Sequence, residues 1–279
     1  MRPLARNIVF FALTFGFVAT CSLAEGINEN EHRRIVSLDF CADQYLMGLA
    51  SPQDIAALSP DATASFSYLR DQARTFSKVR PRAEDLLLLN PDIVIRTYGG
   101  GPNITHLLER VGIRVIQIPY ATDLDSIRRS ILSAAKALDD LDRGHALIRA
   151  MDSKIHSVRQ HQADDKVLYL TSKGAVAGAG TLIDELIDVA NAENFQTKAG
   201  WGALSLERLA YERPDYIAAA FFGGADERTD KWSPTHHPVA RRALKSVPII
   251  DIDGASTACG GWFVLDAAEA IANRNEAMQ

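Results

Sequence analysis

A cysteine between two acidic residues is the first place in this sequence where chemistry could be carried out. Cys41 is preceded by Asp39 and followed by Asp43. A cysteine thiol becomes a strong nucleophile when a base lies within hydrogen-bond reach. No histidine lies nearby in the sequence, so the base would have to come from a distant segment. An exported enzyme with Cys41 as its nucleophile is therefore one hypothesis for this chain.

Other motifs that mark catalytic or metal sites are missing from the sequence. There is no G-x-S-x-G, no H-E-x-x-H and no phosphate-binding loop, and glycines 99–101 do not form a dinucleotide fingerprint. His236 and His237 are neighbours and could ligate a metal, but adjacent residues on an irregular loop rarely point the same way. We therefore expect no catalytic residue, no metal site and no cofactor. A protein that binds a bare metal ion is a further alternative.

Aromatic and polar residues gather instead in loops that follow short apolar segments. Open α/β sheets bind ligands beyond the carboxyl ends of their strands, so these are candidate binding loops. Aromatic rings suit the flat or apolar faces of a bulky ligand, and arginine or lysine suits a polar rim. Packing beneath a loop is the ordinary alternative for any single aromatic, except for Trp201, which lies between two glycines. The candidate ligand-binding residues are Asp39, Phe40, Cys41, Arg80, Tyr98, Lys173, Trp201, Phe222 and Trp262.

The elements that would position these loops alternate between strand and helix along the chain. Helical segments separate most of the strands, and this alternation predicts an α/β fold with mainly parallel sheets. Short apolar strands are predicted at 35–38, 55–58, 93–95, 115–118, 167–170, 216–219 and 247–252.

One long helix is predicted near the middle of the chain, over residues 138–161. Its apolar residues recur with a period close to 3.6, and Asp142 can cap its start. Similar strand-helix-strand patterns lie on its two sides. We therefore predict two α/β lobes, at 33–137 and 165–279, joined by this helix, with a ligand cleft between them. The alternative is an ordinary connecting helix inside a single sheet domain.

A repeated corner between helix and strand supports the two-lobe prediction. The spacing from Glu84 to Pro91 equals the spacing from Glu207 to Pro214. In both places an aspartate and an apolar strand follow the proline. Proline cannot continue a helix and favours extended geometry in the residue before it, so each motif predicts a sharp corner.

The first two dozen residues have the features of a secretory signal peptide. Arg2 and Arg6 precede an apolar run over 8–20, and Ser22-Leu23-Ala24 offers a small-x-small cleavage site. We expect cleavage after Ala24. The residues around Cys21 loosely resemble a lipoprotein box, and an uncleaved anchor is a third alternative. No later apolar run approaches membrane length, so the mature protein is expected to be soluble and exported.

Removal of the signal peptide would leave two cysteines, Cys41 and Cys259. In an oxidising compartment an even pair favours a disulfide, which here would join the two ends of the chain. The alternative is that one or both thiols meet the ligand. The net charge of −5 gives no reason to expect nucleic acid as a partner.

The order of these motifs resembles a known family, and the resemblance covers nearly all of the mature chain. It is carried by the segments RIVSLDFCADQYLMGLA, AEDLLLLNPDIVI, GTLIDELIDVANAENF, GWGALSLERLAYERPDYI and CGGWFVLDAAEAIA. These are similar to the helical-backbone periplasmic solute-binding proteins of ATP-driven (ABC) importers, whose members carry cobalamin, iron siderophores or haem. The resemblance implies two Rossmann-like lobes with a rigid helix between them. It also implies capture of a small-molecule metal chelate in the cleft and its delivery to the membrane permease, without covalent chemistry.

The resemblance also implies roles for particular residues. Glu84 and Glu207 match exposed glutamates that contact basic residues of the permease, and two separated carboxylates would steer such docking. Stabilising a helix N-terminus is the alternative role of each. Trp201 matches a ligand-facing aromatic of the cobalamin-binding relatives, and Tyr98 lies in a loop where these relatives also carry an aromatic. We expect a monomeric periplasmic protein that is not an enzyme.

Overall fold

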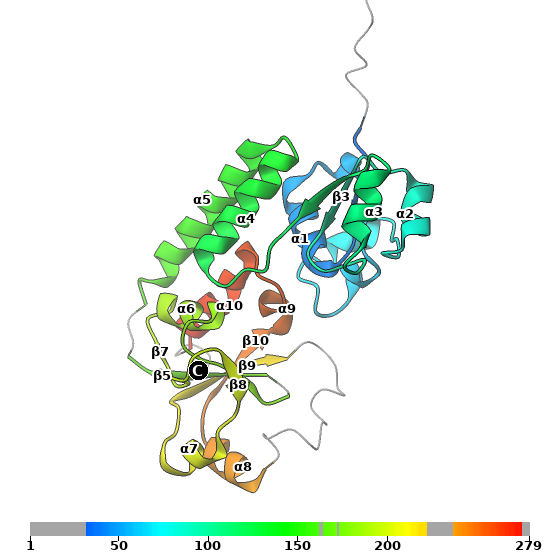
Figure 1. Ribbon diagram of the computed structural model, residues 1–279. Coiled ribbons are helices and arrows are strands. Elements are labelled where there is room, and N and C mark those ends of the chain that lie inside the picture. The colour runs from blue at the N-terminus through cyan, green and yellow to red at the C-terminus, as the bar shows by residue number, and fades with distance from the viewer. Residues whose placement is uncertain (1–31, 162–163, 172, 222–236, 275–279) are drawn as a thin grey trace, which may run out of the picture. The chain divides into compact units, whose positions relative to one another are not determined.

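The computed structural model describes residues 32–161, 164–171, 173–221 and 237–274. The predicted signal peptide, Phe222 and His236 lie outside these residues. From His32 onward the chain forms a unit that contains two β-sheets with helices packed against them (Figure 1). No helix in the described part of the chain is long and apolar enough to cross a membrane.

The first sheet has four parallel strands in the order β2-β1-β3-β4. Its two central strands, β1 and β3, are buried along their whole length, which is why their sequences are almost continuously apolar. One face of these strands packs against α1, and the other packs against α2 and α3. The elements are β1 (Ile35–Ser37), α1 (Phe40–Leu49), β2 (Ile55–Ala57), α2 (Ala83–Leu89), β3 (Ile93–Arg96), α3 (Ile104–Arg110) and β4 (Arg114–Gln117). Three 3-10 turns lie between α1 and α2, at Pro52–Asp54, Pro60–Thr63 and Gln72–Thr75.

The second sheet has the order β10-β9-β5-β6-β8 and is only partly parallel. Strands β5, β9 and β10 are parallel, whereas β6 pairs antiparallel with both β5 and β8. The chain reverses between β5 and β6 at Gly174, whose φ of 78° favours glycine. The strands are β5 (Lys166–Thr171), β6 (Ala175–Ala177), β7 (Glu193–Asn194, beside β5), β8 (Trp201–Ala203), β9 (Tyr216–Phe221) and β10 (Ile249–Asp253). The helices of this half are α6 (Leu182–Val189), α7 (Leu206–Tyr211), α8 (Pro238–Leu244), α9 (Gly254–Thr257), the 3-10 helix η6 (Trp262–Val264) and α10 (Leu265–Ala272).

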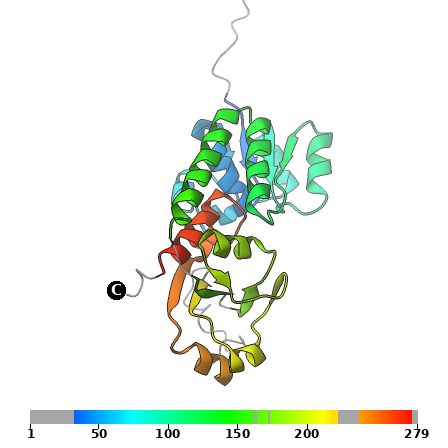
Figure 2. The ribbon, with the colours of Figure 1, turned by 90° about the vertical axis from the view of Figure 1, so that its left-hand side faces the viewer.

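Two antiparallel helices, α4 (Leu124–Ala137) and α5 (Leu141–Val158), connect the two sheets (Figures 1 and 2). Gly144 of α5 lies against α4, where a Cβ atom would come within 2.5 Å of the Ala135 Cβ atom. The close approach of the two helices therefore explains a glycine in the first turn of α5. Asp140 caps α5 by accepting a hydrogen bond from the Arg143 backbone N–H at 3.1 Å, so the prediction that Asp142 is the cap is wrong.

Helix α5 contacts both halves of the chain. Near its start, the Arg143 guanidinium donates a hydrogen bond to the Ala50 carbonyl oxygen at the end of α1, at 2.5 Å. At its end, the Arg159 carbonyl oxygen accepts one from the side-chain amide of Asn191, just after α6, at 2.7 Å. The predicted fold class, two α/β lobes joined by a long helix, is confirmed. Helix α4 also reaches the second half, because the Leu124 backbone N–H donates to Glu185 of α6 at 2.8 Å.

The repeated corner has the same geometry in both halves. After α2, the Asp92 carboxylate accepts a hydrogen bond from the backbone N–H of Arg34, the residue before β1, at 2.7 Å. After α7, the Asp215 carboxylate accepts one from the backbone N–H of Lys166, the first residue of β5, also at 2.7 Å. Each corner thus ties the end of its helix to the start of a neighbouring strand. The corner after α2 is tied to β1, which lies beside β3, and the corner after α7 is tied to β5, which lies beside β9. The two halves share this unit in structure as well as in sequence.

Candidate functional site

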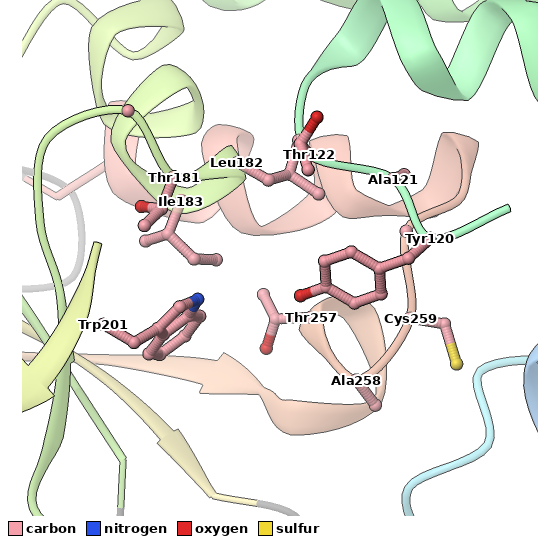
Figure 3. A pocket seen from close by; sticks show the side chains of 12 residues that line it. Tyr120, Ala121, Thr122, Thr181, Leu182, Ile183, Trp201, Thr257, Ala258 and Cys259 are labelled. Atoms are coloured by element: carbon pink, nitrogen blue, oxygen red, sulfur yellow. The ribbon is translucent and has the colours of Figure 1, made fainter. Parts of the chain in front are cut away.

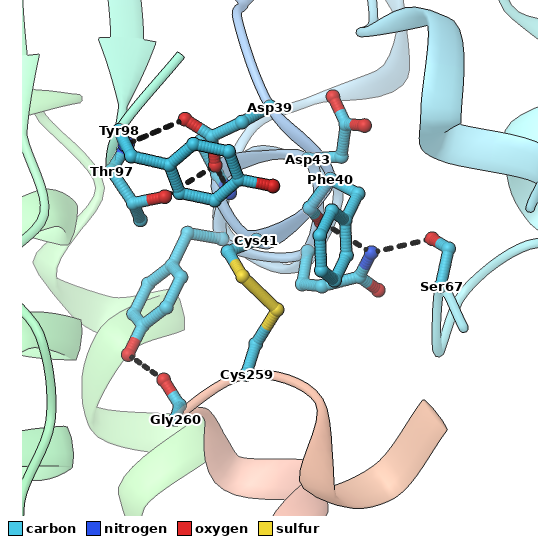
Figure 4. Close-up of a disulfide and its surroundings, with 12 residues drawn as sticks. Asp39, Phe40, Cys41, Asp43, Ser67, Thr97, Tyr98, Cys259 and Gly260 are labelled. Carbon is cyan, nitrogen blue, oxygen red and sulfur yellow. Dashed lines mark hydrogen bonds between the residues drawn. A yellow bond between two sulfur atoms is a disulfide. The ribbon is translucent and has the colours of Figure 1, made fainter. Parts of the chain in front are cut away.

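A disulfide joins Cys41, near the start of α1, to Cys259, in the loop between α9 and η6 (Figure 4). The Cα atoms of the two residues are 5.6 Å apart. Beside the disulfide, the Tyr45 hydroxyl donates a hydrogen bond to the Gly260 carbonyl oxygen at 2.8 Å. Because both sulfur atoms are bonded, Cys41 offers no free thiol, either as a nucleophile or as a thiol contact to a ligand. This geometry contradicts the hypothesis of an enzyme that attacks through Cys41.

A second set of contacts ties the same two parts of the chain together. The Tyr68 ring stacks on Phe263, with ring centroids 4.6 Å apart, and its hydroxyl donates a hydrogen bond to Asp266 of α10. Burial, together with the nearby carboxylates, raises the pKa of Tyr68, so its phenol stays protonated. Lys154 of α5 forms ion pairs with both Asp266 and Glu269. The loop that follows β2 is therefore anchored on α10, which Lys154 in turn ties to α5.

Asp39 holds a loop in place and does not face a ligand. It caps α1 by accepting a hydrogen bond from the Ala42 backbone N–H at 2.9 Å. Its carboxylate also accepts from the backbone N–H groups of Thr97, Tyr98 and Gly99 at 2.8, 3.1 and 2.9 Å, and from the Thr97 hydroxyl. The side chain is 4% exposed, and donors from the chain itself occupy its oxygens. The structure therefore does not support Asp39 as a ligand-binding residue.

Three aromatic side chains, Phe40, Phe66 and Tyr98, form a group beside the disulfide. Tyr98 belongs to the loop that Asp39 holds. Tyr98 remains 58% exposed, and its ring centroid lies 6.2 Å from that of Phe40 (Figure 4). Phe40 in turn meets Phe66 edge-on, with ring centroids 4.8 Å apart. Burial of part of the ring, with help from the Asp39 charge, raises the pKa of Tyr98 to about 12. The phenol is therefore neutral at physiological pH and can act as a hydrogen-bond donor.

A pocket of about 240 Å³ has Cys259 of the disulfide in its lining (Figure 3). Trp201, from β8, and Tyr120, from the segment after β4, project toward it and are 53% and 82% exposed. The Trp201 ring is held edge-on against the buried Tyr169, with ring centroids 6.0 Å apart. The other residues that line the pocket are Ala121, Thr122, Gly180, Thr181, Leu182, Ile183, Thr257, Ala258, Cys259 and Gly260.

The lining of this pocket is uncharged among the described residues. Thr122, Thr181 and Thr257 line it together with apolar and aromatic surface. Their hydroxyls already have partners within the chain: Asp123 for Thr122, the Gly178 carbonyl for Thr181, and the Gly254 carbonyl and Tyr169 for Thr257. A second hollow shares Thr122 and Thr181 with it and is acidic, because five carboxylates line it. These belong to Asp123, Asp184, Glu185, Asp188 and Glu193. Arginine or lysine side chains pair with Asp123, Asp188 and Glu193, so Asp184 and Glu185 supply the negative charge that disfavours an anionic ligand beside the pocket.

Comparison with known families decides what kind of protein carries this arrangement. The family model described as periplasmic binding protein matches residues 73–227, which is more than half of the chain. The chain belongs to this family. The resemblance seen in the sequence is thereby confirmed. A comparison with curated protein sequences gives no match.

Solved periplasmic binding proteins share the fold at low sequence identity. The haem-binding protein RhuT from Roseiflexus sp. RS-1 is 24% identical, with a TM-score of 0.68, and the match covers 89% of this chain and 100% of that one. The haem-binding protein HutB of Vibrio cholerae is 22% identical, with a TM-score of 0.68, covering 87% and 98%. The vitamin B12-binding protein BtuF of Vibrio cholerae is 17% identical, with a TM-score of 0.62, covering 88% and 98%. At these identities the comparisons establish the two-lobe fold and leave the ligand open.

Several predicted ligand residues of this periplasmic binding protein lie away from the pocket. Trp262 packs against Tyr45 and Gly48, where a Cβ atom would come within 2.4 Å of the indole ring, so it is a packing residue. Arg80 forms an ion pair with Asp85 at 2.9 Å. Lys173 is exposed in the turn between β5 and β6. The prediction for Phe222 concerns a residue outside the described part of the chain.

Tyr120 is an exposed aromatic of the pocket that the sequence did not lead us to predict. A usable signal was present, because Tyr120 follows β4 as Tyr98 follows β3, beyond the carboxyl ends of parallel strands. The threonines were also missed, since single threonines in loops carry no distinctive pattern. Of the predicted residues, Trp201 and Cys259 line the pocket, and Phe40 and Tyr98 form the neighbouring aromatic group with Phe66.

Glu84 and Glu207 lie at equivalent places in the family fold. Both are exposed, in the first turns of α2 and α7. Neither forms an ion pair with another residue in the described ranges. Their carboxylates are therefore accessible to a partner, and docking on a permease stays a prediction.

Proposed function

We propose that this periplasmic binding protein captures a metal-chelate nutrient and delivers it to the membrane permease of an ATP-driven importer. The observation that carries the proposal is the pocket with the exposed rings of Trp201 and Tyr120. Two large exposed aromatics at one pocket suit a ligand with broad flat or apolar faces. The segments after β4 and β10 line this pocket, and α/β folds bind ligands beyond the carboxyl ends of their strands.

The chemistry of the lining favours a chelate with an uncharged rim. Members of the family that the sequence resembles carry iron siderophores, haem or cobalamin. Haem carries two carboxylates and many ferric siderophores are anionic, whereas the corrin ring of cobalamin is rimmed by amides. Amide N–H groups can donate to the threonine hydroxyl oxygens, and uncharged amides avoid repulsion from the carboxylates of the adjacent hollow. We therefore propose a ligand of the cobalamin type.

The proposal includes export and docking. Residues 1–24 would be removed as a signal peptide. The lobes at 33–137 and 165–279, which the helix at 138–161 joins, would hold the ligand between them. The carboxylates of Glu84 and Glu207 would meet basic residues of the permease. The family match supports a periplasmic role, and the exposure of both glutamates supports their availability.

Equilibrium titration with three chelates tests the ligand proposal. Quenching of tryptophan fluorescence in the mature protein is measured with cyanocobalamin, with haem and with a ferric siderophore. We expect the tightest binding for cyanocobalamin. Trp201→Ala and Tyr120→Ala should each weaken it at least tenfold, because each removes an aromatic face of the pocket. Ile249→Ala, which shortens an exposed apolar side chain on β10, is the control and should leave the affinity unchanged. Saturable binding of none of the three chelates would contradict the proposed function.

A further inference from the structure

Two short helices each leave one large apolar side chain almost fully exposed. Leu88 of α2 is 86% exposed, and Tyr211 of α7 is 87% exposed. Each lies four residues after one of the two glutamates, Glu84 and Glu207. Residues four apart in a helix are neighbours on one face, with Cβ atoms about 5–6 Å apart. Each helix therefore presents a carboxylate and an apolar side chain together.

The two positions are equivalent in structure as well as in spacing. Helix α2 buries Leu86 and helix α7 buries Leu209, each two residues after its glutamate. Both helices then turn at a buried proline, and the next aspartate binds the start of the neighbouring strand at 2.7 Å. Leu88 and Tyr211 therefore occupy the same place in two copies of one structural unit. Single exposed apolar residues are ordinary, but chance placement does not explain this recurrence.

The charged neighbours of the two glutamates are paired within the chain. Asp85, next to Glu84, forms an ion pair with Arg80 at 2.9 Å. Arg208, next to Glu207, forms an ion pair with Glu212 at 2.9 Å and lies over the Phe195 ring. These contacts leave the two glutamates as the carboxylates that the helices offer to a partner.

We propose that Glu84 with Leu88, and Glu207 with Tyr211, form two equivalent docking epitopes for the importer's permease. Each epitope would place its carboxylate against a basic side chain and its apolar side chain in an apolar depression beside it. Because the epitope occurs twice in one chain, the partner presents two equivalent sites, as a two-fold symmetric pair of permease subunits does. The inference rests on the proposed function. It adds an apolar contact to the docking that the two glutamates would provide.

The two components of each epitope contribute to different rate constants. Exposed carboxylates steer the encounter, so they govern the association rate and its dependence on salt. An apolar side chain that is buried only in the complex governs how long the complex lasts, and thus the dissociation rate. Substitutions of the two kinds should therefore have separable effects.

Binding kinetics on the intact importer test the proposal. The permease with its ATPase subunits is held in lipid nanodiscs, and association and dissociation of the full mature protein are recorded at several salt concentrations. Leu88→Ser with Tyr211→Ser should raise the dissociation rate at least tenfold and change the association rate less than twofold. Glu84→Gln with Glu207→Gln should slow association and flatten its salt dependence. Val111→Ser with Ile249→Ser removes two other half-exposed apolar side chains and should change neither rate.

The outcomes separate this inference from the function on which it rests. An unchanged dissociation rate in the leucine and tyrosine variant, together with slowed association in the glutamate variant, would overturn the apolar contact and keep charge-based docking. Normal rates in both variants would overturn docking at α2 and α7 altogether. Unfolding temperature and cyanocobalamin affinity are measured for each variant. Both should match the wild type, because the substituted side chains are exposed and outside the pocket.

Discussion

Two aspartates at the start of α1 show how the surroundings decide what a carboxyl group does. Asp39 and Asp43 are both buried. Asp39 accepts hydrogen bonds from four backbone N–H groups. Asp43 accepts from the backbone N–H and hydroxyl of Ser59, at 2.9 and 2.6 Å, and burial dominates, raising its pKa to about 6. Donors from the chain itself hold both carboxylates.

Replacement of Asp39 should destabilise the fold. Asp39→Ala removes the cap of α1 and leaves the N–H groups of residues 97–99 without their acceptor, which should cost about 2–4 kcal/mol. Denaturant unfolding measures this cost. Asp61→Ala, at an exposed aspartate, is the control and should stay within about 0.5 kcal/mol of the wild type. An equally small effect at Asp39 would refute the anchoring role.

Asp43 should give the protein an unusual pH dependence. Its pKa in the folded protein is about 6, against 3.8 for an ordinary aspartate, so the folded state holds the proton more tightly. The stability from this group is greatest below pH 4, and about 3 kcal/mol is lost as the pH rises through 6. The free energy of unfolding is measured for the wild type and for Asp43→Asn at pH 4, 5, 6 and 7. As the pH rises, the stability of the wild type should fall relative to that of the asparagine variant. A constant difference would contradict the raised pKa.

At the scale of elements, helix packing overrides helix propensity at Gly144. Propensity alone predicts that Gly144→Ala stabilises α5 by about 1 kcal/mol. The structure predicts the opposite, because the new Cβ atom would lie 2.5 Å from the Ala135 Cβ atom and push α4 away. We expect a net loss of about 1–3 kcal/mol in thermal or denaturant unfolding. Ala150 is exposed on the same helix, so Ala150→Gly measures helix propensity without a change in packing. It should lower the free energy of unfolding by about 1 kcal/mol. A stabilised Gly144→Ala variant would show that the helices do not pack as described.

Much of the order of elements could be predicted from the sequence, and the rest depended on contacts between distant segments. The buried strands β1, β3, β5 and β9 are short apolar runs, and the repeated proline corners marked the equivalent helices. The antiparallel strands β6 and β8 were not predicted, because they lie among glycines that read as loop and form only through pairing across the sheet. In the site, Trp201 was recognised from its flanking glycines. The packing role of the partly buried Trp262 was not predicted, because its partner Gly48 lies on a helix that is distant in the sequence.

At the scale of the whole molecule, covalent and polar ties connect the first lobe to the end of the chain. The disulfide spans 218 residues of sequence, and the contacts of Tyr45 with Gly260 and of Arg70 with Asp253 accompany it. Such ties restrict the separation of the lobes around the pocket. They agree with a receptor whose site is largely preformed.

Loss of the disulfide should lower stability substantially. Releasing a loop of this length should cost up to about 5 kcal/mol in the chain-entropy account. Cys41→Ser with Cys259→Ser, and the wild type after reduction, should show similar drops in the free energy of unfolding. Alkylation of the unreduced mature protein followed by mass analysis should find no free thiol. Two alkylated cysteines would show that the disulfide does not form.

The central claim is that the protein carries a metal chelate in the periplasm. The most direct measurement is to purify it from its native periplasm and record the absorption spectrum together with its metal content. We predict one equivalent of a coloured chelate, with cobalt and corrin absorption bands. A protein that carries another class of small molecule, or one that arrives empty and then binds neither cobalamin, haem nor a ferric siderophore, would contradict the account.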